Sequence, residues 1–507
     1  MERTVSIPSF HQIPFAARAW IVTLVCLIPS LWLFWHQELN ILISLVILLL
    51  LLVISNTSPK LGICVTIAFL FLLGDIRRIV GSVLGFPTLD TLLLVGPLVS
   101  AILGIPILIR LRLTDGISKA VFALMVMMTL EIFNPHQGSV VVGLSGAMFY
   151  LIPMFWFWIG RRYGTDSLLS SLLYRVLFPL SILAAALGLC QSYIGFLPWE
   201  TIWIAAVSSH FHALQLGGGF IRSFGFSVNG IEYAGLLLGG SAFTLATFFG
   251  GRRVYAIFFP LLAIALFLAS SRTAIIKLLF AIAASWALSN KSGRGWAVRL
   301  PFAFAIGVGM LAFVLSQVGG GSGAGQQSSA AQASTQHQLQ GLSHPLDSRY
   351  STAGAHSQLL LQGVLQGFRN PLGSGIGSTT LGSGKFGGGE NEDSDSSDLH
   401  SSEIDISDAF IAMGFLGGII YLVTIILVLK RAVVFGRSAP KYLGLPTLGL
   451  LAAMGGAWMS PGMYGMSPLI WLIIGALSRP RASEMLASRK ISQTKLNKAT
   501  PLLPVVP

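Results

Sequence analysis

Two arginines stand in otherwise apolar sequence, among neighbours that are typical of anion-binding sites. Arg272 lies in "FLASSRTAIIKLLFA" (267–281), flanked by two serines and a threonine, and Arg222 lies in the glycine-rich stretch "GGGFIRSFGF". A guanidinium fork, nearby hydroxyls and the free amides of a helix N-terminus all suit a phosphate group. The pattern therefore indicates an anion clamp. The simpler alternative is that Arg272 only reaches up to lipid headgroups.

A second cluster of reactive residues stands before a later apolar run, in "GGGENEDSDSSDLHSSEIDISDAF". We interpret 390–398 as a solvated acidic strip. Glu403, Asp405 and Asp408 stand at the entrance to the apolar run, shortly after His400. On a helix there, His400, Glu403 or Asp408 could face the cavity that contains Arg222 and Arg272. The acids lack EF-hand spacing, and His210 and His212 have no matching third ligand nearby, so no metal is expected.

The composition decides which elements must position these residues. The 507 residues are 54% hydrophobic and only 10% charged, against about 25% charged in a soluble domain. This chain is therefore predicted to be an integral membrane protein. The formal net charge of +13 fits basic cytoplasmic loops better than nucleic acid binding.

A membrane-crossing helix needs about 20 apolar residues, and by that criterion we expect an all-α bundle of about 12–14 transmembrane helices. The candidate spans are 17–36, 39–55, 60–75, 88–109, 118–133, 139–160, 174–196, 229–249, 254–270, 273–289, 298–318, 407–429, 442–458 and 462–478. With the N-terminus inside, six clusters of Lys and Arg fall on the cytoplasmic side. Arg77 and Arg78 break this rule, and they either join the anion site or reach for headgroups.

The same topology places one long loop, 319–406, on the extracytoplasmic side. Its first residues, "GGGSGAGQQSSAAQAS", are expected to be flexible. Residues 348–368 are predicted to form an amphipathic helix with an apolar stripe of Leu360, Val364, Leu365 and Phe368. We expect this helix to lie across the outer mouth of the bundle, and "GSGIGS" after it to be an ordinary glycine loop.

The predicted organisation thus has five parts. Residues 1–196 hold the N-terminal transmembrane helices, and 197–318 hold the transmembrane helices with both arginine motifs. The loop 319–406 follows. Residues 407–478 are the C-terminal transmembrane helices, and 479–507 are a basic cytoplasmic tail.

Several of these segments resemble the O-antigen ligase/polymerase superfamily of bacterial multispanning glycosyltransferases. The resemblance covers roughly residues 218–430. It rests on "RSFGFSVNGIEYAGLLLGG", on "SSRTAIIKLLFA", on "RYSTAGAHSQLLLQGVLQGFRNPLGSGIGS" and on the closing "DAFIAMGFLGGIIYLV". Members move glycans from an undecaprenyl-pyrophosphate carrier to an acceptor on the outer face of the bacterial inner membrane.

The resemblance implies a role for each candidate residue. Arg222, Arg272 and Arg349 would bind the donor pyrophosphate. The family's catalytic His position holds Glu403 here, and His400 lies three residues earlier. The base would then be His400, Glu403 or Asp405.

The implied enzyme needs no metal or cofactor, because its donor is already activated. Its partners would be the lipid-linked glycan, an acceptor hydroxyl of a glycan, lipid or protein, and the lipid bilayer. It would sit in the inner (plasma) membrane with both termini cytoplasmic and its active site on the extracytoplasmic face. The alternative is a transporter or permease for an anionic lipid-linked or polar substrate.

Overall fold

The computed structural model describes residues 38–87, 90–110, 113–207, 220–289, 330–343, 353–380, 404–455, 457–459 and 462–479. Two predicted spans, 17–36 and 298–318, and the tail beyond 479 lie outside these residues. Within the described ranges the chain is helical and forms no strand, as predicted.

The described helices follow the apolar runs of the sequence. In chain order they are α2 (Leu39–Thr57), α3 (Pro59–Leu84), α4 (Leu92–Arg110), α5 (Gly116–Glu131), α6 (Val140–Phe149), α7 (Phe155–Tyr163), α8 (Asp166–Ser171), α9 (Phe178–Tyr193), α10 (Pro198–Val207), α11 (Gly230–Phe249), α12 (Phe259–Leu268), α13 (Arg272–Ser289), α15 (Ala330–Ser343), α16 (Ala353–Arg369), α18 (Asp405–Ser438), α19 (Lys441–Ala453) and α20 (Met466–Ser478). Short helical turns η2 (Pro135–Gln137), η3 (Ile152–Met154), η4 (Leu172–Leu177) and η7 (Arg253–Phe258) join some of them.

Seven helical stretches in the described part of the chain are long and apolar enough to cross a membrane. They are Leu39–Thr57, Leu92–Arg110, Val140–Tyr163, Asp166–Tyr193, Gly230–Phe249, Arg272–Ser289 and Asp405–Ser438, and two shorter apolar helices cover Arg253–Leu268 and Met466–Ser478. These helices indicate a helical membrane protein. The full number of spans stays a prediction.

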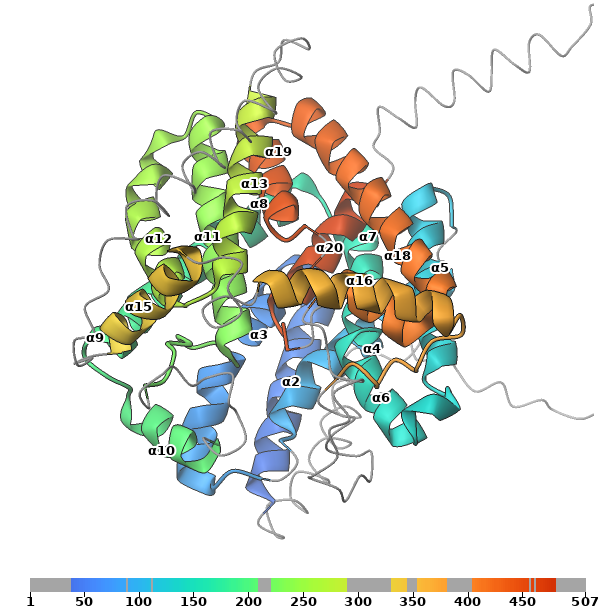
Figure 1. The fold of residues 1–507 in the computed structure, drawn as a ribbon, viewed down its shortest axis with the longest axis horizontal. Coiled ribbons are helices and arrows are strands. Elements are labelled where there is room, and N and C mark those ends of the chain that lie inside the picture. Colours follow the sequence, from blue (N-terminus) through green and yellow to red (C-terminus); the bar gives the residue numbers. More distant parts are fainter. Residues whose placement is uncertain are drawn as a thin grey trace, which may run out of the picture.

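The core of the bundle is built around α20, which lies against α7 near the centre of Figure 1. Every residue of α20 is buried. Glycines let the two backbones approach: a Cβ at Gly160 would stand 2.0 Å from Leu472 O, and one at Gly475 would stand 1.9 Å from Phe157 O. Small residues at a helix contact are the usual means of close packing in membranes.

The glycine run after α16 is a packed part of the core, so its interpretation as an ordinary loop was wrong. Residues 373–380 are buried. Ser374 N donates to Ile411 O (2.9 Å) and Gly375 N to Ala412 O (3.0 Å). The carbonyls of Ile411 and Ala412 can accept these bonds because α18 is broken nearby, at Gly414, whose φ is +65°. The missing Cβ of Gly414 also leaves room for Pro371 O. Glycine tolerates that backbone conformation at little cost.

The run expected to be flexible also contains ordered residues. Ala330 to Ser334 belong to the first turns of α15, where Ala331, Ala333 and Ser334 are buried. The expectation was therefore wrong for these residues. Alanine-rich sequence has a high helix propensity, and packing on α9 and α12 adds to it.

Helix α16, Ala353–Arg369, overlaps the amphipathic helix predicted over 348–368, and much of its apolar stripe is exposed. Leu360, Leu365 and Phe368 are 37%, 44% and 57% exposed. The face that packs on α18 carries Gly363 and Gly367 instead. In Figure 1, α16 runs across the bundle in front of α18 and α7.

The glycine face of α16 can be tested by filling it. A Cβ at Gly363 would stand 1.9 Å from Ser407 Oγ. We expect Gly363→Leu to lower the thermal stability of the detergent-purified protein by about 1–3 kcal/mol, because overpacking strains a close contact. Gln362→Leu, which adds the same side chain at an exposed position, is the matched control and should leave the melting temperature nearly unchanged. Equal melting temperatures for both variants would contradict this packing.

Candidate functional site

Arg222 lies in the segment that leads into α11. The residue is partly buried, and the residues that follow it, 223–228, are fully buried. The segment ends at Asn229, whose side chain accepts from Glu232 N (2.9 Å) and so caps α11. Asn229 Nδ2 also donates to Gly462 O (3.1 Å). Arg222 is therefore held on a fixed backbone rather than on an open loop.

Arg272 is the first residue of α13, directly after a tight turn from α12. In that turn Ser270 has a φ of +58°, the one positive φ among the described residues other than glycine. A left-handed non-glycine residue is an uncommon conformation and is often found at functional positions. The turn puts Arg272 at the N-terminus of α13, where the free amides of a helix favour an anion.

Helix α15 brings a histidine to the two arginines. Arg272 Nη2 donates to His337 O (2.7 Å), and Gln338 Nε2 donates to Phe267 O (3.1 Å), which attaches α15 to the end of α12. Burial, then the charge of Arg222 and then that of Arg272, together lower the pKa of His337 to about 4. Both guanidinium groups therefore lie close to one imidazole.

This cluster has the electrostatics of an anion site. Arg222 and Arg272 are close enough to act on each other, so two like charges share one neighbourhood. Arg272 Nε is buried and has no acceptor within the described ranges. A bound anion would both offset the repulsion and accept from that donor.

The acidic candidate that the structure describes, Asp405, is the first residue of α18. It is 5% exposed, and its Oδ2 accepts from Met459 N (2.6 Å) and from Tyr421 OH (3.3 Å). The bond from Met459 attaches the start of α18 to the segment before α20, whereas the bond from Tyr421 stays within α18. Arg349, His400 and Glu403 lie outside the described residues, so their predicted roles stay predictions.

Asp405 also lies near other ionisable residues, namely Lys277, Asp408 and Tyr150. The carboxylate acts electrostatically on Lys277, which is partly buried five residues after Arg272, about 7.5 Å further along the helix axis. Asp408 and Asp405 both act on the buried Tyr150, whose hydroxyl lies 3.0 Å from Thr379 Oγ1. The interior next to the arginines is thus unusually polar for a membrane bundle.

His337 and Lys277 are not among the site residues predicted from the sequence. His337 stands in a polar stretch with no motif, so no signal marked it. Lys277 had a signal: an ionisable residue inside an apolar helix is a functional candidate by default.

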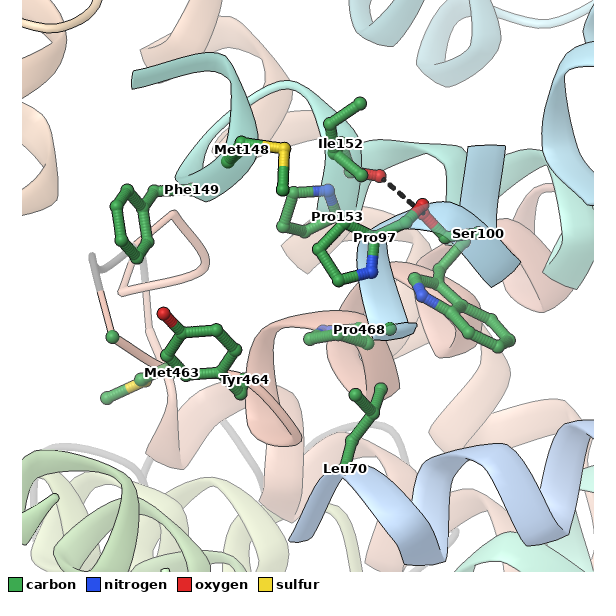
Figure 2. Close-up of a pocket in the computed structure, with 13 residues that line it drawn as sticks. Leu70, Pro97, Ser100, Met148, Phe149, Ile152, Pro153, Met463, Tyr464 and Pro468 are labelled. Atoms are coloured by element: carbon green, nitrogen blue, oxygen red, sulfur yellow. Dashed lines mark hydrogen bonds between the residues drawn. The ribbon is translucent and has the colours of Figure 1, made fainter. Parts of the chain in front are cut away.

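A separate cavity with mostly apolar walls lies between α4, η3 and the segment before α20 (Figure 2). It encloses about 380 Å³, including open space at its mouth. Pro97, Pro153 and Pro468 line it, and the Ser100 hydroxyl in its wall donates to Ile152 O (3.1 Å). None of the predicted site residues lines it. Walls of this kind suit a hydrocarbon chain.

The state of His337 can be measured directly. Because its folded pKa is near 4 rather than the usual 6.5, His337 should stay neutral at neutral pH. Docking of α15 should then be fully favoured above about pH 6.5 and should weaken as the pH falls toward 4. Carbethoxylation of His337 by diethyl pyrocarbonate, followed by mass spectrometry, should change little between pH 7.5 and 5.5, whereas an ordinary imidazole loses about tenfold in rate. A tenfold loss at His337 would contradict the assignment, and the exposed His136 reports reagent activity.

The chain matches no family model, no curated protein and no solved structure. Its function is therefore inferred from the residues described above and from the motif resemblance around Arg222 and Arg272.

Proposed function

We propose that this protein is a membrane glycosyltransferase that moves a glycan from an undecaprenyl-pyrophosphate donor to an acceptor hydroxyl, as a polysaccharide polymerase or O-antigen ligase. The observation that carries the proposal is the convergence of Arg222 and Arg272 beside His337 at the start of α13. Two arginines and a helix N-terminus match the charge and oxygen pattern of a diphosphate.

The chemistry needs stabilisation of the leaving group above all. The acceptor oxygen forms a bond to the anomeric carbon while the bond from that carbon to the pyrophosphate oxygen breaks, and the electron pair leaves with the pyrophosphate. Arg222 and Arg272 would offset the charge that grows there, at roughly 3–4 kcal/mol per well-placed donor. A single displacement of this kind inverts the anomeric centre.

The proton of the acceptor hydroxyl goes to a base, for which His400, Glu403 and Asp405 are the candidates. The bonds of Asp405 to Met459 N and Tyr421 OH favour a structural role for this carboxylate. A catalytic role for it requires one oxygen to face the acceptor. A base in reach of that proton would contribute about 10²–10⁴-fold to the rate.

The proposed function also implies an orientation of the protein in the membrane. The arginine cluster would lie on the extracytoplasmic side of the bacterial inner membrane, in a bundle of about 12–14 spans with cytoplasmic termini. The apolar cavity of Figure 2 would lodge part of a lipid chain, because its walls offer mainly hydrocarbon contacts.

A permease for an anionic or lipid-linked substrate is the second candidate, and two observations favour it. Helix α18 is broken at Gly414, and broken helices form the binding sites of many transporters. Charged residues such as Lys277 and Glu232 lie within candidate spans. Substrate counterflow in proteoliposomes without any glycan transfer would establish the permease instead.

Substitution of Arg272 tests the proposed glycosyltransferase activity. Arg272→Ala should reduce glycan transfer from a purified undecaprenyl-pyrophosphate-linked donor by at least about 10²-fold, because the leaving-group charge loses a preorganised donor. Arg272→Lys should recover only part of this loss, since an ammonium lacks the planar fork. The matched control is Arg253→Ala, an exposed arginine before α12, which should transfer at the wild-type rate. Normal transfer by the Arg272→Ala variant would overturn the assignment.

A further inference from the structure

Arg78 is a buried cation whose surroundings differ from those of every predicted site residue. It lies on α3 and is 1% exposed. Its guanidinium carbon stands 4.1 Å from the ring centroid of Phe224 and 4.6 Å from that of Trp203. The two expectations for this residue, reaching for headgroups or joining the arginine cluster, are not what the structure shows.

The hydrogen bonds of Arg78 go mostly to backbone carbonyls of the segment that follows Arg222. Nη2 donates to Ser227 O (2.5 Å) and Val228 O (3.4 Å), and Nη1 donates to Gly225 O (3.4 Å). A salt bridge with Asp75 Oδ1 (3.2 Å) supplies the countercharge. Three carbonyls of one short stretch therefore converge on a single guanidinium.

Gln191 on α9 holds the same stretch from another side. Its Oε1 accepts from Phe224 N (3.0 Å) and Gly225 N (2.8 Å), and its Nε2 donates to Gly225 O (3.1 Å). Glu200 on α10 accepts from Gln191 Nε2 (2.7 Å) and so fixes the amide. Burial raises the pKa of Glu200, more than the nearby donors lower it.

We propose that Arg78 is a positioning residue: it clamps residues 224–228 and thereby holds Arg222 against Arg272 and His337. The clamp binds backbone and aromatic rings, so it fixes a conformation and takes no ligand itself. Its consequence for donor binding rests on the proposed function, whereas its effect on residues 221–228 does not.

Lysine cannot replace this arginine. A planar fork reaches several carbonyls at once and stacks on rings, whereas an ammonium is a compact point charge. The neighbouring Arg77 is the natural control, because its Nε pairs with Asp90 Oδ2 (2.5 Å), and within the described residues no hydrogen bond or salt bridge joins it to residues 221–228.

The first experiment measures the segment itself, without reference to any activity. Trypsin can cut after Arg222 only when the buried residues that follow it open locally. In the purified full chain, we expect Arg78→Lys to release the fragment that begins at Ser223 about tenfold faster than wild type, with Arg77→Lys unchanged. N-terminal sequencing identifies that fragment among other products. Equal release by the Arg78→Lys and Arg77→Lys variants would overturn the clamp.

A second variant decides the matter if Arg78→Lys fails to fold. Trp203→Leu removes one stacking ring and leaves the carbonyl bonds in place. Faster release of the Ser223 fragment from this variant supports the clamp, and an unchanged rate refutes it.

A double-mutant cycle separates positioning from general stability. With inorganic pyrophosphate as the probe, Arg78→Lys should weaken binding about tenfold in the wild-type background, which is about 1.4 kcal/mol. In an Arg222→Ala background the same change should alter the Kd less than about twofold, because there is no Arg222 left to position. Equal effects in both backgrounds would show that Arg78 does not act through Arg222.

The two proposals can fail separately. If the wild-type protein transfers no glycan but Arg78→Lys still frees the Ser223 fragment, the enzyme proposal fails and the clamp stands. If transfer is present and the fragment appears at equal rates, the clamp fails alone.

Discussion

A charged group inside an apolar bundle has to find partners, and this constraint separates the arginines of this protein into two kinds. Arg78 is fully buried, and three carbonyls, a carboxylate and two rings surround its guanidinium. Arg272 donates to one carbonyl, keeps a buried Nε without an acceptor in the described part of the chain, and lies near a second arginine. Both guanidinium groups keep a buried Nε without an acceptor among the described residues, but Arg78 has a carboxylate countercharge and several carbonyl acceptors. Arg272 lies beside another cation and would gain more from an anion, so we propose binding for Arg272 and positioning for Arg78.

Irregular backbone is the second means by which the fold makes polar contacts inside the bundle. Near the break at Gly414, the carbonyls of Ile411 and Ala412 accept hydrogen bonds from backbone amides of the buried glycine run instead of from α18 alone. Backbone away from a regular helix is tolerated at membrane depth only where protein covers it. Helix α16 packs closely on the first turns of α18 through Gly363 and Gly367.

Hydropathy predicted where the helices lie, because an apolar run long enough to cross a membrane leaves little choice of structure. The span expected at 229–249 is α11, Gly230–Phe249, and the one at 273–289 is α13, Arg272–Ser289. Helix α18 ends at Ser438 rather than near 429, since Lys430 and Arg431 continue it beyond the apolar run. Hydropathy identifies the apolar part of a helix that lies in the membrane core, and it does not detect a polar extension of the same helix.

Orientation and tertiary partners were harder to predict. The apolar stripe of α16 predicted an amphipathic helix, but it did not say which face of that helix packs on the protein. In a membrane protein the apolar face can be the outer one, and glycines can form the packed face. The nearness of Arg222 and Arg272 followed from topology, because both were expected at outer helix ends. The part played by His337 did not, since α15 joins the site through backbone and amide contacts that carry no sequence pattern.

A neutral His337 limits the positive charge of the cluster that it forms with Arg222 and Arg272. A protonated His337 would be a third positive charge beside Arg222 and Arg272, and its low pKa keeps that charge away at neutral pH. The carbonyl of the same residue meanwhile accepts from Arg272, so α15 contributes a partner for one guanidinium without adding charge. A diphosphate bound here, as we propose, would add negative charge beside the two arginines. Binding energy from that neutralisation would also favour the docked position of α15, because the helix and the anion hold the same arginine.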